Sequence, residues 1–282
     1  MQTLKTILLS LASAVAMPLF AVPIFLTTTG GQLLRIDSSA PGTVTSSSTI
    51  TGLQTGTSLT GIDFRPADGL LYGVGSDGRL YSINSGSGLA SQIGPGAIFT
   101  SGSAAFGVDF NPVPDRLRVI GTGGDSYRIN QLTGALVLRD NDLTAGSTVA
   151  GVAYTNNLAG ATQTTLFGID SGTDSLVMIG GVNGTPSPNG GIVTTIGLLG
   201  VDTTNMVGFD ISSSGVAFAS LTNGQGVSSL YSINLSSGAA TSLGALSGTV
   251  TGLAIAPVPE PTTWLTGLSG LAALFLGRRR KR

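Results

Sequence analysis

The 282-residue chain contains no cysteine and no histidine, and only 10% of its residues are charged. The lack of cysteine excludes disulfide bonds, thiol nucleophiles and thiolate metal sites. The lack of histidine removes the usual general base of acyl-transfer enzymes. A typical soluble domain has roughly 25% charged residues, so serine, threonine and glycine must supply much of the polar surface here.

The region 22–258 also lacks lysine and glutamate, and its charges come from seven arginines and thirteen aspartates. Its net charge of about −6 disfavours nucleic acid as a partner, because affinity for nucleic acid comes from neutralising phosphates. Two aspartates can still serve glycoside hydrolysis, but only at a carboxyl separation that a sequence does not give. Composition therefore leaves few routes to catalysis.

Residues 1–21 have the pattern of a secretory signal peptide. One early positive charge, Lys5, precedes an apolar stretch from Ile7, and Ala14 and Ala16 form an A-x-A arrangement. Cleavage after Ala16 and cleavage after Ala21 both fit. We expect the cell's export machinery to recognise this segment, the alternative being an apolar strand or helix of the core.

The C-terminal segment 259–282 has three parts. Pro259, Glu260 and Pro261 form a stiff joint, and residues 262–277 carry no charge. The chain then ends in five basic residues: Arg278, Arg279, Arg280, Lys281 and Arg282. A permanent transmembrane helix needs about 20 apolar residues, so this hydrophobic helix predicts transient membrane association. The basic residues would stay in the cytoplasm and place the body across the membrane.

These three parts, in this order, resemble the PEP-CTERM sorting signal of Gram-negative bacteria. The resemblance implies that an exosortase, a membrane protease-transpeptidase, recognises and removes the tail, in organisms that commonly make exopolysaccharide. It also implies a membrane-anchored precursor and a product at the outer surface or outside the cell. An ordinary single-span anchor is the alternative.

The body is an internal repeat. The matching elements are TGIDFRP (60–66), FGVDFNP (106–112), AGVAYTN (150–156), VGFDISS (207–213) and TGLAIAP (251–257). Their glycines are 46, 44, 57 and 44 residues apart, and three further strand-like runs follow each of the first four elements. Four strands in a unit of this length are typical of a β-propeller blade.

The two ends of the repeat predict how the ring closes. The last element is a lone first strand, whereas the region 22–258 opens with a second strand, so the two ends complete one blade. We therefore predict an all-β fold, a five-bladed β-propeller. Residues 186–191, PSPNGG, lie in the longer fourth unit and indicate an extended loop. The recurring G-[IV]-D-F-x-P and L-Y-x-I-N elements resemble the bacterial family called domain of unknown function 4394, which supplies no activity.

The stretch GVGSDG (73–78) matches a dinucleotide-binding pattern, but that mechanism needs a helix after the glycines. A strand-like run follows instead. We therefore interpret Asp77 and Gly78 as a tight hairpin turn and reject nucleotide binding.

Asp63, Asp109 and Asp210 occupy one repeat position in three innermost strands, while Ala153 and Ala254 replace the acid in the other two. If this position faces the central channel, three carboxylates converge where oxygen ligands suit Ca²⁺ or Mg²⁺. Alternatively, each aspartate ties a loop or a neighbouring blade through backbone N–H groups.

Other charged residues carry weaker predictions. The stretch RDND (139–142) lacks the spacing of a Ca²⁺ loop and indicates a solvated turn. Arg65, Arg116 and Arg118 lie close to the first and second strands of two blades, and two roles fit them: binding acidic sugars from one face, or pairing with Asp68 and Asp115.

Three functions remain open. The first is a non-enzymatic surface or matrix propeller that binds polysaccharide or another envelope component. The second is a metal-assisted hydrolase or lyase that uses the three repeat-position acids, and the third is a structural spacer. Propellers host all of these functions, so the fold alone does not choose among them.

Overall fold

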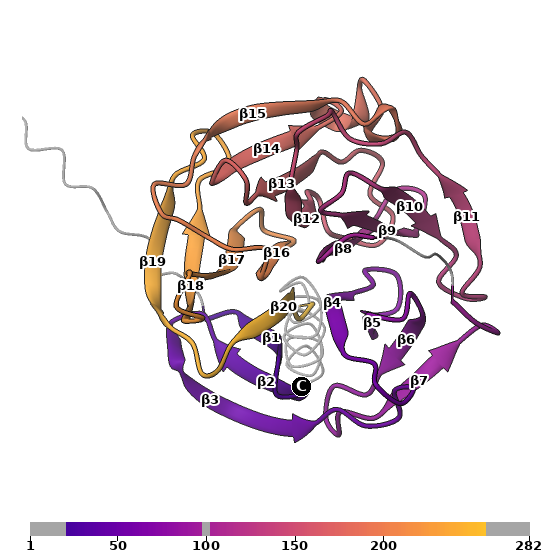
Figure 1. Cartoon of the computed structure of the whole chain (residues 1–282), viewed down its shortest axis with the longest axis vertical. Helices are drawn as coiled ribbons and strands as arrows, with labels where there is room; N and C mark the ends of the chain where they lie inside the picture. Colours follow the sequence, from indigo (N-terminus) through magenta and orange to yellow (C-terminus); the bar gives the residue numbers. More distant parts are fainter. Residues whose placement is uncertain (1–20, 98–101, 258–282) are drawn as a thin grey trace, which may run out of the picture.

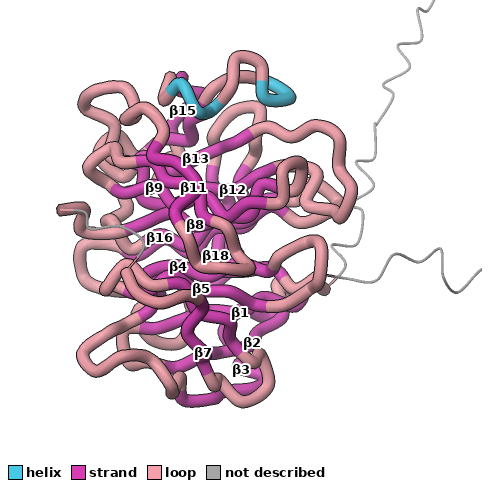
Figure 2. The backbone as a smooth tube through the Cα atoms, turned by 90° about the vertical axis from the view of Figure 1, so that its right-hand side faces the viewer, coloured by secondary structure: helices cyan, strands magenta, loops and turns pink. Residues whose placement is uncertain are grey.

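A computed structural model of the chain describes residues 21–97 and 102–257. Within these residues, five four-stranded antiparallel sheets surround a central axis (Figure 1). Helix is confined there to two short 3₁₀ turns beside β15 (Figure 2). The prediction of an all-β, five-bladed propeller is therefore confirmed.

The strands that line the axis carry the repeat elements: β4 (Leu59–Phe64), β8 (Phe106–Asn111), β12 (Val149–Tyr154), β16 (Val207–Ile211) and β20 (Val250–Ile255). The second strands are β5 (Leu71–Gly75), β9 (Arg116–Gly121), β13 (Leu166–Asp170), β17 (Ala217–Thr222) and β1 (Pro23–Thr28). Each blade continues outwards from these two strands.

The third strands are β6 (Leu80–Ile83), β10 (Ser126–Ile129), β14 (Ser175–Ile179), β18 (Ser228–Ile233) and β2 (Gln32–Asp37). The outermost strands are β7 (Ala90–Ile93), β11 (Leu136–Arg139), β15 (Val193–Leu198), β19 (Ala240–Ala245) and β3 (Ala40–Thr49). We number the blades from the one that holds β1, so blade 2 begins at β4 and blade 5 at β16.

Blade 1 joins the two ends of the described chain. Strand β20 pairs with β1, with Ile255 opposite Ile24 and Leu253 opposite Leu26. The sheet order β20-β1-β2-β3 confirms the predicted closure. Pairing the last inner strand with the first strand of the body links both ends of the ring through one sheet, so β1 is paired on both sides.

Burial decreases from the axis to the rim. All six residues of β12 are buried, whereas all four residues of β11 are exposed. The core lies between neighbouring blades, as where Val74 of blade 2 shares a cluster with Val119 of blade 3. Blades bury both faces of their inner strands in this way, which explains why those strands are almost uniformly apolar.

The Y-x-I-N elements form the turns between third and fourth strands. In blade 3, the side-chain oxygen of Asn130 accepts the backbone N–H groups of Leu132 and Thr133 at 3.0 and 3.2 Å. The turn ends at Gly134, whose φ of 65° lies in the left-handed region. Asparagine and glycine therefore recur because this turn needs a local acceptor and a positive φ.

The extra residues of the fourth unit connect β14 to β15. The 3₁₀ turn Pro188–Gly190 lies within this loop, and the loop packs back on blade 3. There Asn141 donates its N–H to the carbonyl oxygen of Asn189, and Thr144 donates to that of Gly191. The loop therefore contacts a neighbouring blade and leaves the four-stranded sheet of blade 4 intact.

The predicted sorting segment, 259–282, and all of the predicted signal peptide except residue 21 lie outside the described residues. In the part of the chain that the structure describes, no helix is long and apolar enough to cross a membrane. The boundaries 1–21, 22–258 and 259–282 stay predictions.

Candidate functional site

The five repeat glycines lie where the inner strands approach one another around the axis. A β-carbon at Gly208 would lie 2.5 Å from the backbone nitrogen of Leu253, and one at Gly107 would lie 2.8 Å from that of Val152. Together with their neighbours, the five glycines line a cavity of about 10 Å³, which is close to the room that one water needs. The repeat glycines are therefore required by close approach of backbones.

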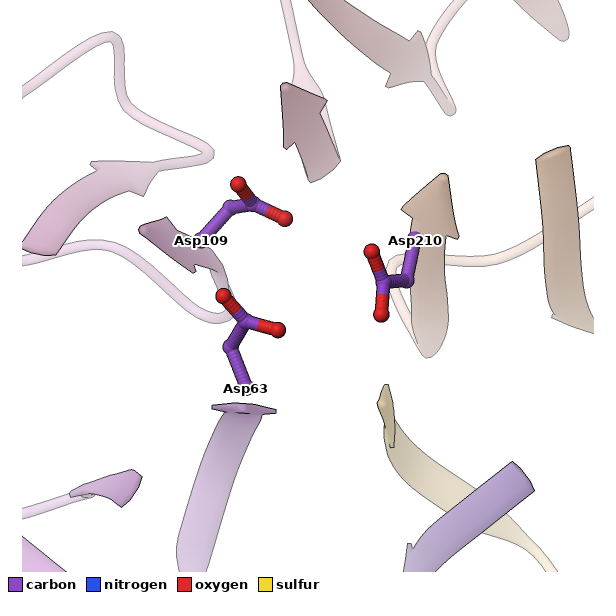
Figure 3. A group of neighbouring side chains, drawn as sticks. All are labelled: Asp63, Asp109 and Asp210. Carbon is purple, nitrogen blue, oxygen red and sulfur yellow. The ribbon is translucent and has the colours of Figure 1, made fainter. Parts of the chain in front are cut away.

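Asp63, Asp109 and Asp210 follow three of these glycines by two residues, so each acid lies on the same face of its strand as its glycine. Figure 3 shows the three carboxylates turned towards one another across the axis. One oxygen from each lies within 4.8 Å of the others, and each side chain is at most 1% exposed. The predicted convergence of these acids is therefore observed in the structure.

Each aspartate also binds the backbone of the next blade around the ring. Asp63 Oδ2 accepts the N–H of Phe110 at 2.7 Å, and Asp109 Oδ1 accepts that of Tyr154 at 3.2 Å. Asp210 Oδ2 accepts the N–H of Ile255 at 2.7 Å. The alternative role predicted for these acids, tying neighbouring blades, is therefore also observed, and it uses one oxygen of each carboxylate.

The second oxygens differ among the three acids. Asp210 Oδ1 accepts the N–H of Ile211 at 2.6 Å. By the repeat, an acid at position 153 would bind this N–H, but that position holds alanine. Asp63 Oδ1 and Asp109 Oδ2 are buried and have no hydrogen-bond partner. Two buried acceptors of the cluster are thus unsatisfied, which is costly unless a proton or a cation reaches them.

Burial dominates the electrostatics of the cluster. It raises the pKa of Asp63 well above its usual value, and the nearby charge of Asp210 raises it further. Burial followed by the charges of Asp63 and Asp210 does the same for the pKa of Asp109. Burial raises the pKa of Asp210 to about 7, although the N–H groups of Ile255 and Ile211 oppose it. Three full negative charges are thus unfavourable here without compensation.

The enclosure of the acids limits their chemistry. The three side chains are buried among the inner strands, and the cavity lined by the repeat glycines has room for about one water. Carboxylates placed in this way can share protons or ligate a small cation. A sugar ring is far larger than the space beside them, so the geometry does not suit glycoside hydrolysis.

The arginines considered for sugar binding already form ion pairs or hydrogen bonds within the protein. Arg65 forms ion pairs with Asp68 at 2.5 Å and with Asp115 of the next blade, as the alternative prediction stated. Arg116 donates to the carbonyl oxygens of Pro114 and Asp115. These two side chains stabilise the loops beside β4 and β9.

Arg118 belongs to a buried network that the sequence did not predict. Its guanidinium donates to Asp140 at 3.0 Å, to Tyr154 at 2.7 Å and to Asn189 at 2.5 Å. Asp140 also pairs with Arg128 at 2.8 Å. The prediction of a solvated turn at 139–142 is therefore wrong for Asp140, whose side chain is 2% exposed. The available signal was Arg118 itself, a charge between the apolar residues Leu117 and Val119 of β9.

Comparison with protein families matches two parts of the chain. The model described as Domain of unknown function (DUF4394) matches residues 32–254, which include all five glycines and all three acids. The chain belongs to the DUF4394 family. A second model, the PEP-CTERM protein-sorting motif, matches residues 257–281, directly after β20. This motif implies that the DUF4394 propeller is exported and processed by an exosortase at the cell envelope.

Solved structures resemble the DUF4394 propeller only distantly. A protein of unknown function from Bacteroides thetaiotaomicron VPI-5482 is 13% identical with a TM-score of 0.49, and the match covers 79% of this chain and 58% of that one. A putative 6-phosphogluconolactonase from Bacteroides fragilis NCTC 9343 is 12% identical with a TM-score of 0.43, covering 82% and 69%. Dihydro-heme d1 dehydrogenase NirN is 15% identical with a TM-score of 0.36, covering 78% of this chain and 42% of its own. Comparison with curated proteins found no match.

Proposed function

We propose that the protein is a surface or extracellular-matrix propeller that binds polysaccharide or another envelope component without turning it over. The observation that carries the proposal is the sorting motif at 257–281, which directly follows the inner strand that closes the ring. A ring of five rigid blades offers two broad faces for binding there.

The rim of the molecule supports binding through hydrogen bonds more than through charge. Outer strands such as β3 (Ala40–Thr49) and β15 (Val193–Leu198) are rich in exposed serine or threonine. Across the described residues, five arginines form ion pairs with aspartates: Arg65, Arg79, Arg118, Arg128 and Arg139. Arg35 lies over the ring of Phe25 and Arg116 binds carbonyl oxygens. An uncharged stretch of polysaccharide fits such a surface better than an acidic one.

The metal-assisted hydrolase or lyase is the weaker alternative. It would need substrate to reach Asp63, Asp109 and Asp210, and these acids are sealed inside the ring. Their burial supports a binding or structural role instead. Reproducible turnover of a glycan or lactone, lost on substituting one of these acids, would favour the alternative.

Binding to the matrix of the producing bacterium tests the proposal. Exopolysaccharide purified from that organism, separated into neutral and acidic fractions, would be mixed with the protein and analysed by co-sedimentation and calorimetry. We expect saturable binding to the neutral fraction that changes little with added NaCl, because few ion pairs form. No new reducing ends should appear. Absence of binding to every fraction and to isolated envelopes would overturn the proposal.

A further inference from the structure

We propose that Asp63, Asp109 and Asp210 together bind one calcium ion on the propeller axis. The first observation is their convergence from three separate blades onto one enclosed point (Figure 3). The second is independent of it: Asp63 Oδ1 and Asp109 Oδ2 are fully buried and have no hydrogen-bond partner. Hydrogen bonds hold the other oxygen of each of these two carboxylates in place, which leaves Asp63 Oδ1 and Asp109 Oδ2 available to a ligand.

The spacing of the oxygens suits calcium. Calcium binds oxygen ligands at about 2.3–2.6 Å, so two ligands on opposite sides of the ion are about 4.8 Å apart. The three carboxylate oxygens lie within 4.8 Å of one another, and one ion between them can contact all three. Calcium also accepts irregular coordination, whereas Mg²⁺ demands shorter bonds and a near-ideal octahedron.

The charge of the site favours a cation. Each of the three acids is buried, and in the described part of the chain no arginine forms an ion pair with any of them. Buried carboxylates are normally paired or bound to a metal, because an uncompensated buried charge is costly. Calcium compensates two negative charges at once.

The bound ion would connect blades that are distant in sequence. Asp63, Asp109 and Asp210 belong to blades 2, 3 and 5, and each already binds the backbone of the next blade. An ion at their centre fastens the inner strands from the axis, as the β20–β1 pairing fastens the ring through blade 1. Because the site is enclosed, the ion enters before the ring closes and leaves slowly afterwards.

Asp109→Asn is the most informative substitution. Asparagine keeps the oxygen that accepts the N–H of Tyr154 and replaces the unpartnered Oδ2 with an amide nitrogen. The variant is therefore expected to fold but to lose a ligand and a charge. Asp202→Asn is the matched control, since Asp202 is an exposed acid in the loop before β16.

The test measures metal content and calcium-dependent melting of the protein purified from cells that express the full chain. We expect about one calcium ion per chain by elemental analysis in the wild type and in Asp202→Asn, and none in Asp109→Asn. Added calcium should raise the melting temperature by about 5–10 °C over chelator in the first two proteins only. The ion should resist chelator in the folded protein and be released on unfolding.

Two results would overturn the proposal. One is a wild-type protein without stoichiometric calcium whose melting curve is the same in calcium and in chelator. The other is calcium bound equally by Asp109→Asn, or removed at once by chelator, because either would place the ion on the surface. The proposal stands apart from polysaccharide binding, which a calcium-free propeller can also perform.

Discussion

At the scale of single residues, the glycine and the aspartate of the repeat element G-x-D have two different structural roles. The glycine of G-x-D lets inner strands approach, since a β-carbon at Gly61 would lie 2.6 Å from Val108 Cγ2. The acid two residues later crosses to the next blade, as Asp63 does to Phe110. Glycine recurs in all five elements because the approach occurs five times, whereas three acids suffice at the axis.

The raised pKa values predict how stability changes with pH in chelator. A carboxyl with a higher pKa in the folded than in the unfolded protein makes the folded state bind more protons, so stability falls as pH rises. For Asp210 the window runs from its ordinary pKa near 4 to about 7. The free energy of unfolding should fall there by about 1.4 kcal/mol per pH unit for each proton.

Denaturant unfolding at a series of pH values, in chelator, measures this slope. Asp109→Asn should reduce it, because the substitution removes a buried carboxyl whose own pKa is raised. Asp202→Asn should leave the slope unchanged. Tyr154 is a further titratable group beside the cluster. Burial raises its pKa, so it stays neutral in this range. Stability that rises between pH 4 and 7 would contradict the prediction.

The sequence predicted which three acids lie close together, but not which of their oxygens lack a hydrogen-bond partner. Register within the repeat places positions 63, 109 and 210 together, and that inference needs only the spacing of the glycines. The unpartnered oxygens depend on backbone positions set by packing. The Arg118–Asp140 pair was missed because its partners lie 22 residues apart, Arg118 on β9 and Asp140 directly after β11.

At the scale of strands and turns, the features that depend on neighbouring residues were easier to predict from the sequence than those that depend on distant contacts. The predicted third strands and their Y-x-I-N ends correspond to β6, β10 and β18, because alternating residues and turn formers act locally. The fold of loop 186–191 was less predictable. Its 3₁₀ turn rests on contacts with blade 3, including the hydrogen bond from Arg118 to Asn189.

The asparagine turns give a prediction at this scale. Asn84 Oδ1 accepts the N–H groups of Gly86 and Ser87, both at 3.0 Å, in an exposed turn. Asn84→Ala should lower the free energy of unfolding by about 1 kcal/mol, because two N–H groups lose a local acceptor. Asn84→Asp keeps the acceptor and should cost less. Urea unfolding compares them, and equal stability of Asn84→Ala and wild type would contradict this role.

At the scale of the whole molecule, the strand that closes the ring is also the strand that precedes the sorting motif. β20 pairs with β1 to complete blade 1, and the sorting motif matches from residue 257, two residues after that strand ends. Cleavage at the motif can therefore remove the tail without taking a strand from the ring. The closure was predictable because the repeat begins and ends with complementary parts of one blade.

The mass of the mature protein tests the export and processing of this propeller most directly. The protein would be purified separately from the envelope and from the medium of its native host, and its ends determined by intact mass. We predict a chain that begins after Ala16 or Ala21 and ends near Pro259–Pro261. A mature chain that still carries Arg278–Arg282 would contradict exosortase processing and leave an ordinary membrane anchor.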